Sequence, residues 1–170
     1  MINAVFLTGL ISSIILVIGS AWPERPLKNW IFGIGNFGML AYASLAFFLE
    51  ANPFFFVLLE LLCAASSVLT LLDVKEKIST HLIVVSGLAL LIWSLFLFED
   101  ATTVFFILGL IALALGFISK DTVKRNAVFL LGCILISTFS FIKEDWIFFW
   151  LNAVFGLFSA FYLLKALRKR

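Results

Sequence analysis

The sequence predicts an all-α integral membrane protein with seven transmembrane helices, and two observations support that fold class. The first is composition: 64% of the 170 residues are hydrophobic, 13% are charged, and the mean hydropathy is +1.18. Soluble domains are about half apolar and about one-quarter charged, so this composition excludes a soluble fold. The second is that short charged clusters divide the chain into apolar runs long enough to cross a bilayer.

The seven apolar runs are the expected transmembrane spans. They cover residues 2–22, 30–49, 54–72, 81–98, 102–118, 127–142 and 146–164. A helix that crosses a bilayer needs about 20 residues, and the run at 127–142, AVFLLGCILISTFSFI, is the shortest of the seven. The first run is expected to be a span and not a signal peptide, because no positive charge precedes it.

Charged residues alternate between the two sides of this arrangement. Eleven of the 12 Lys and Arg residues fall on one side, namely Arg25, Lys28, Lys75, Lys77, Lys120, Lys124, Arg125, Lys165, Arg168, Lys169 and Arg170. The other side holds Lys143 with five acidic residues, which are Glu50, Glu99, Asp100, Glu144 and Asp145. Because cytoplasmic loops carry the positive charge, we expect the N-terminus outside and the C-terminus in the cytoplasm. The expected location is the cytoplasmic (inner) membrane of a prokaryote.

The first three spans and the last three show an internal repeat. A shift of 100 residues aligns Gly9 with Gly109, and a shift of 92 aligns Glu60 with Asn152, while the second spans need a shift of 97. Three spans, one linking span and three more spans give a 3+1+3 arrangement, with both halves in the same orientation. The expected parts are a first three-helix repeat (1–72), a linking helix with its loops (73–100), and a second repeat with a basic cytoplasmic tail (101–170).

Glu60 is the only charged residue inside a predicted span. A carboxylate there costs roughly 2.5–3.5 kcal/mol on insertion scales, so it normally faces a protein interior or a wet cavity. Stripes of small and polar residues indicate which other side chains face inward. The candidate substrate-binding residues are Glu60, Asn152, Asn36, Tyr42, Ser67 and Ser159. The alternative for each is a packing role, and for Glu60 it is a protonated carboxyl bonded to a neighbour such as Asn152 or Tyr42.

This architecture resembles the SWEET, PQ-loop and PnuC group of small transporters. The resemblance includes the last span, WIFFWLNAVFGLFSAFYLLKALRKR, in which Asn152 is followed four residues later by Gly156. In sugar-transporting SWEETs an asparagine in span 3 and another in span 7 face the substrate, and the resemblance places these roles on Glu60 and Asn152. The hinge prolines of SWEET spans are missing, since all three prolines are expected to lie in loops outside the apolar runs. A glutamate in place of asparagine suits a basic substrate or proton coupling.

Two functions are consistent with these features. The first is a small-solute transporter that works by alternating access, with a midplane site between the two repeats for a polar or basic metabolite or vitamin. The second is a non-catalytic membrane subunit that scaffolds or anchors a larger complex. The sequence contains no HExxH or GxSxG motif, so we expect no enzyme activity, cofactor or metal. The expected partners are the lipid bilayer and a small-molecule substrate but no nucleic acid, and a homo-oligomer remains open.

Overall fold

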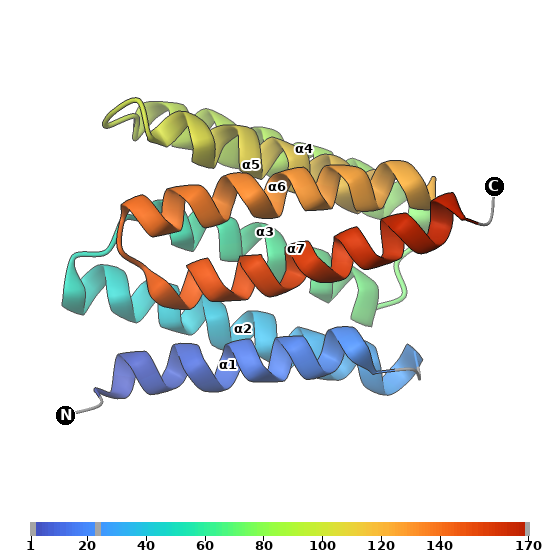
Figure 1. Cartoon of the computed structure of the whole chain (residues 1–170), viewed down its shortest axis with the longest axis horizontal. Coiled ribbons are helices and arrows are strands. Elements are labelled where there is room, and N and C mark those ends of the chain that lie inside the picture. The colour runs from blue at the N-terminus through green and yellow to red at the C-terminus, as the bar shows by residue number, and fades with distance from the viewer. Residues whose placement is uncertain (1–2, 23–24, 169–170) are drawn as a thin grey trace. The chain divides into compact units, whose positions relative to one another are not determined.

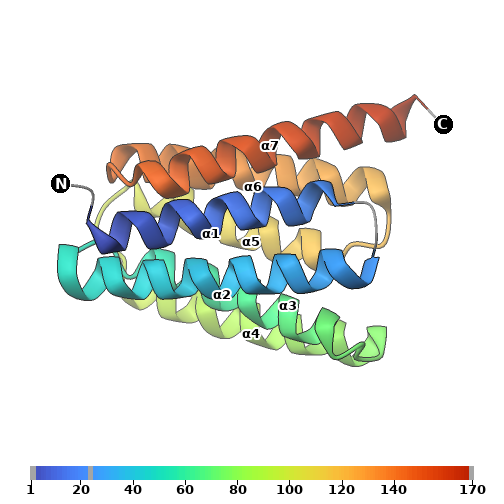
Figure 2. The same ribbon diagram turned by 90° about the horizontal axis from the view of Figure 1, so that it is seen from below.

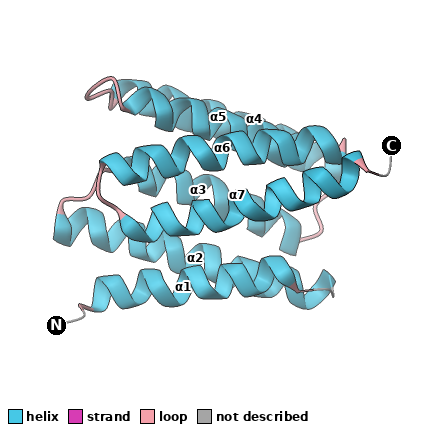
Figure 3. Ribbon diagram, viewed as in Figure 1, coloured by secondary structure: helices cyan, strands magenta, loops and turns pink. Residues whose placement is uncertain are grey.

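The computed structural model describes residues 3–22 and 25–168, and the regular structure in these residues is entirely α-helical (Figures 1 and 3). Seven helices are present in this part of the chain. They are α1 (Ala4–Ala21), α2 (Arg25–Glu50), α3 (Phe55–Leu71), α4 (Glu76–Phe96), α5 (Thr103–Ile118), α6 (Thr122–Ile142) and α7 (Trp146–Leu167). The predicted all-α fold class is therefore confirmed, together with the seven helices.

Four helices extend beyond their predicted apolar runs, each at the end that carries basic residues. Three begin five residues before the run, α2 at Arg25, α4 at Glu76 and α6 at Thr122, and α7 continues three residues beyond its run to Leu167. Lys, Arg and Glu are good helix formers, and long basic side chains reach the membrane surface from a helical backbone. The prediction that residues 127–142 form the shortest span was wrong. Helix α6 has 21 residues, whereas α5 has 16 and α3 has 17.

Five of the described helices are long and apolar enough to cross a membrane: α1, α2 from Pro26, α4, α6 and α7. They identify the chain as an integral membrane protein. Helices α3 and α5 are apolar but shorter, and at 1.5 Å per residue they cover about 26 and 24 Å. That is somewhat less than the hydrocarbon core, which is about 30 Å thick.

The chain divides into two compact units, residues 1–79 and 80–170. In the first unit α2 packs against both α1 and α3, and in the second unit α6 packs against both α5 and α7. Figures 1 and 2 show α1 beside α2, and α6 beside α7, in both views. Helix α4 contacts α5 where Gly87 faces Ala114. Each unit therefore has a central helix, α2 or α6, with one neighbour on each of two faces.

Glycines bring α1 and α2 into close contact. The contact pairs, in order along α1, are Gly9 with Tyr42, Ser12 with Gly38, Leu16 with Gly35, and Gly19 with Phe32. A Cβ atom at Gly35 would lie only 2.6 Å from Cγ of Leu16. Because interiors are already close-packed, a larger residue there would push the two helices apart.

The contact between α5 and α6 is built in the same register. Its pairs are Gly109 with Ile136, Leu113 with Gly132, and Gly116 with Phe129. Residue numbers in α5 are 100 higher than at the equivalent positions of α1, and those in α6 are 94 higher than in α2. With these shifts, the pair Gly9–Tyr42 corresponds to Gly109–Ile136, and the pair Leu16–Gly35 corresponds to Gly116–Phe129. The packed helices therefore relate α2 to α6 by a shift of 94 residues. The sequence alignment used a shift of 97, which differs by three residues, or nearly one helical turn.

Candidate functional site

Glu60 lies near the middle of α3, three residues before the helix midpoint at Cys63. Its side chain is buried, with 3% of its surface exposed. Among the buried side-chain polar atoms of the described residues, Oε2 of Glu60 is the only one with no hydrogen-bond partner. Leaving a buried acceptor unpaired costs about 1–3 kcal/mol, and more if it is charged. The atom therefore marks a place where a ligand or a proton is expected.

Glu60 belongs to the face of α3 that packs against α2. Ser67 and Leu71 follow Glu60 by seven and eleven residues, which at 3.6 residues per turn places all three on one face. Ser67 and Leu71 contact α2 at Asn36 and Gly33, respectively. The antiparallel register of these contacts places Ala43, itself buried, level with Glu60. The small Ala43 side chain offers the carboxyl group no hydrogen bond.

Two of the predicted site residues, Asn36 and Ser67, lie together and bind each other. The Asn36 amide donates to Oγ of Ser67 over 2.6 Å, and both side chains are buried. The bond joins α2 to α3 about two turns from Glu60, or about 10 Å along the helix. Their first role is therefore to hold the helix on which Glu60 lies.

Tyr42 points in a different direction. Its ring lies against Gly9 of α1, where a Cβ atom would approach the ring carbon Cδ2 to 2.7 Å. The side chain is buried. Tyr42 therefore fills the space that Gly9 leaves between α1 and α2, on another face of α2 from Asn36.

In the second unit, Asn152 lines a groove between α6 and α7 with a volume of about 400 Å³. Asn152 is 7% exposed, and its amide donates to the Phe148 carbonyl of its own helix over 2.9 Å. The groove is mainly apolar, and its lining residues are Leu130, Cys133, Ile134, Ser137, Thr138, Phe141, Phe149, Asn152, Ala153, Gly156, Leu157 and Ala160. A mainly apolar groove with a few polar groups is typical of a small-molecule site.

Gly156 keeps this groove open. A Cβ atom there would lie 3.4 Å from Cβ of Cys133, which is an ordinary contact. Close approach of α6 and α7 therefore does not require glycine at this position. The prediction of site residues omitted Ser137 and Thr138, although their spacing from Cys133 on α6 indicates a shared face. Ser159 is half-buried on α7 and is not among the lining residues.

The acidic edge of the second unit explains the one basic residue that departs from the charge pattern. Nζ of Lys143 lies 3.2 Å from Oδ2 of Asp100 and 3.3 Å from Oε2 of Glu99. The hydrogen bond from the Thr102 hydroxyl and the nearby Lys143 lower the pKa of Asp100 to about 2. Partial desolvation lowers the pKa of Lys143, but the bonds to Asp100 and Glu99 raise this pKa by a larger amount. The pKa of Lys143 therefore lies above its usual value. Lys143 is therefore neutralised by two carboxylates.

Within residues 3–22 and 25–168, no group of three His, Cys, Asp or Glu residues is arranged to hold a metal ion. Neither Cys63 nor Cys133 forms a disulfide bond. Comparisons with protein-family models, curated proteins and solved structures give no match to this chain. The described residues thus form a helical integral membrane protein in which one buried carboxyl oxygen, Oε2 of Glu60, has no hydrogen-bond partner.

Proposed function

We propose that this protein is a small-solute transporter that works by alternating access. Glu60 and Asn152 are its principal substrate-binding residues, in a midplane site between two three-helix repeats. In this proposal the further substrate-binding residues are Asn36, Tyr42, Ser67 and Ser159. The single observation that supports this function most strongly is the unpartnered Oε2 of Glu60, buried in the middle of an apolar helix.

The chemistry of Glu60 favours a substrate that brings its own donor. A buried carboxyl group needs a cation, a hydrogen-bond donor or a proton, and Ala43 of the packed helix supplies none of these. A substrate with an amine, an amide or a hydroxyl group would satisfy Oε2 and release the cost of leaving it unpaired. We therefore propose a polar or basic metabolite, with proton coupling as a second use of the same carboxyl group.

The repeated register of the helix contacts supports a transporter of two similar halves. Shifts of 100 and 94 residues relate the α1–α2 contact to the α5–α6 contact. A shift of 92 takes Glu60 to Asn152 and Ala64 to Gly156. Parallel repeats of this kind place substrate sites near the midplane and rock against each other. In this proposal α4 links the halves, with the N-terminus outside and the C-terminus in the cytoplasm.

The α6–α7 groove supports the proposal independently. Asn152 and Ser137 both line this largely apolar space. Oγ of Ser137 donates to the Phe149 carbonyl over 3.3 Å, which leaves its lone pairs available as acceptors. In our proposal Asn152 and Ser137 orient the polar end of the solute while the groove holds its apolar part.

The test is solute uptake into proteoliposomes by the purified protein and by two matched variants. Pools of labelled amines, amino acids and B vitamins identify the solute. Glu60→Gln is expected to lower uptake at least about tenfold, since it removes the charge and the proton site at nearly constant shape. Glu144→Gln, the same change at an exposed loop residue, is expected to leave uptake unchanged.

Uptake that survives Glu60→Gln in a folded protein would remove Glu60 from the mechanism. A protein that takes up no solute from any pool, and that copurifies in mild detergent with a second membrane protein, would support the alternative of a scaffolding subunit.

A further inference from the structure

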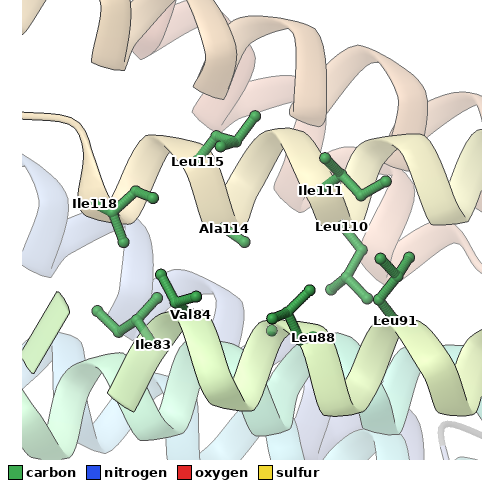
Figure 4. Close-up of a pocket in the computed structure, with 10 residues that line it drawn as sticks. Ile83, Val84, Leu88, Leu91, Leu110, Ile111, Ala114, Leu115 and Ile118 are labelled. Atoms are coloured by element: carbon green, nitrogen blue, oxygen red, sulfur yellow. The ribbon is translucent and has the colours of Figure 1, made fainter. Parts of the chain in front are cut away.

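A second hollow, a crevice, lies between α4 and α5, and none of the residues proposed for the solute lines it. Figure 4 shows aliphatic side chains of both helices around this space, with Leu88 of α4 and Leu110 and Ala114 of α5 directed into it. Its volume is about 190 Å³. The lining residues are Ile83, Val84, Gly87, Leu88, Leu91, Leu110, Ile111, Ala114, Leu115 and Ile118. The only occupant that such a lining accepts is an apolar one.

Gly87 forms part of this crevice without being required by helix packing. A Cβ atom there would meet only Cβ of Ala114, at 3.4 Å, which is an ordinary contact. At Gly109 and Gly116, on the face of α5 that packs against α6, the same added atom would come within 2.7 and 2.6 Å of a neighbour. Small side chains at 87 and 114 thus preserve a space that larger ones would fill.

The crevice is slightly shorter than a single leaflet. Its lining runs from Ile83 to Leu91 on α4 and from Ile118 to Leu110 on α5. Each of these segments rises about 12 Å, compared with about 15 Å for half of the hydrocarbon core. Because α5 ends at Ile118, the crevice begins at the end of this helix and stops near its midpoint.

The mouth of the crevice lies at the basic edge of the second unit. Lys120 follows Ile118 by two residues, and Lys124 and Arg125 stand in the first turn of α6. All three basic side chains are exposed. Asp121 lies between these basic residues in sequence, and it caps α6 by accepting from the amides of Val123 and Lys124. The surface at the mouth thus carries more positive than negative charge.

We propose that this crevice binds one acyl chain of an anionic phospholipid from the leaflet on the basic side, with its phosphate held by Lys120, Lys124 and Arg125. The length of the crevice matches a chain that enters from the surface and ends at the midplane. The basic mouth favours an anionic headgroup over a zwitterionic one. This site is independent of the solute site, because none of its lining residues belongs to that site.

Native mass spectrometry of the full-length protein tests the site with two added lipids of identical chains, phosphatidylglycerol and phosphatidylcholine. The unmodified protein is expected to retain phosphatidylglycerol in preference. Lys120→Gln should lower that preference roughly fivefold and leave phosphatidylcholine binding unchanged. Lys165→Gln, on exposed α7 at the same basic edge, should have no effect.

Gly87→Leu tests the acyl chain separately from the charge. The added side chain fills the crevice, so retention of both lipids should fall, whereas Val85→Leu on the exposed side of α4 should change neither. Ala114→Leu fills the crevice from α5 and serves if Gly87→Leu does not fold. Equal retention of both lipids by the unmodified protein, or undiminished retention after the crevice is filled, would overturn the proposal.

Discussion

The contact between α2 and α3 in the first unit and the contact between α6 and α7 in the second are built from similar residues with different results. In the first, a Cβ atom at Gly33 would come within 2.8 Å of Leu71, and Asn36 bonds Ser67 over 2.6 Å. In the second, Gly156 meets Cys133 only at an ordinary distance, and a groove of about 400 Å³ lies beside it. One contact is tight and the other leaves room for a ligand.

The difference shows that a small residue in a membrane helix has two distinct uses. Gly33 allows two helices to approach closely, which is the usual role of small residues between membrane helices. Gly156 leaves space beside Asn152 that no side chain fills. If this comparison is correct, the same substitution at the two glycines will damage different properties.

The largest effect on stability is expected from Gly33→Leu. The new side chain must displace Leu71 from its place between α2 and α3, so the free energy of unfolding should fall by about 1–3 kcal/mol. Gly156→Leu extends into the groove and should change that free energy by about 1 kcal/mol at most, while solute uptake is lost. Reversible unfolding by SDS titration measures the first property and proteoliposome uptake the second. Equal losses of stability would remove the distinction.

A smaller effect is expected from the hydroxyl groups that cross the two contacts. Ser67→Ala leaves the buried Asn36 amide without its acceptor and should cost about 1–1.7 kcal/mol. Ser137→Ala removes a longer bond of 3.3 Å to a backbone carbonyl and should cost about 0.6 kcal/mol. The same SDS titration measures both, and Thr70→Ala, whose hydroxyl bonds its own helix, is the control. A Ser67→Ala cost no larger than that of Ser137→Ala would contradict the tight contact.

The smallest effect is expected at the acidic ends of the two helix pairs. Glu50, which ends α2, accepts from the Asn3 amide, whereas Asp100, at the corresponding edge of the second unit, pairs with Lys143. The folded pKa of Asp100 is about 2, below its usual 3.8, so its ionised form stabilises the fold above pH 4. That contribution is lost as the pH falls from about 4 toward 2.

Lys143→Gln should therefore lower the unfolding temperature at pH 5 by a few degrees at most and have less effect near pH 2. Thermal unfolding in detergent at the two pH values measures the difference, with Lys165→Gln at the opposite edge as the control. An equal effect of Lys143→Gln at both pH values would show that the pairs with Asp100 and Glu99 do not contribute.

The sequence predicted the helices better than their contacts. Hydropathy located all seven helices because an apolar run has few other ways to satisfy its backbone in a membrane. It placed the starts of α2, α4 and α6 too late, because helical hydrogen bonding continues through the flanking polar residues. Residue type also indicated that Glu60 and Asn152 would be buried, as both are.

What the sequence could not give is the distance between packed helices. Gly33 and Gly156 are the same residue in similar apolar surroundings, and only the neighbouring side chain, Leu71 or Cys133, determines whether space is left. Tyr42 and Asn36 are six residues apart on α2, and the Tyr42 ring lies against Gly9 of α1. Such differences depend on side-chain size and direction in a partner helix, which no pattern within one helix contains.

The central proposal is that water and solute reach both Glu60 and Asn152, and thiol accessibility tests it most directly. Cysteine is introduced at each position in a protein lacking Cys63 and Cys133, and a charged, membrane-impermeant thiol reagent is applied to either side of oriented vesicles. The controls are Leu61→Cys, next to Glu60 on the exposed face of α3, and Phe161→Cys on the exposed face of α7.

Because a thiol reacts as the thiolate, which forms only where water reaches it, the reaction reports a wet path through the membrane. We predict that Glu60→Cys and Asn152→Cys react from both sides and that the two controls do not. Reaction at 60 and 152 no faster than at 61 and 161 would contradict the transporter proposal.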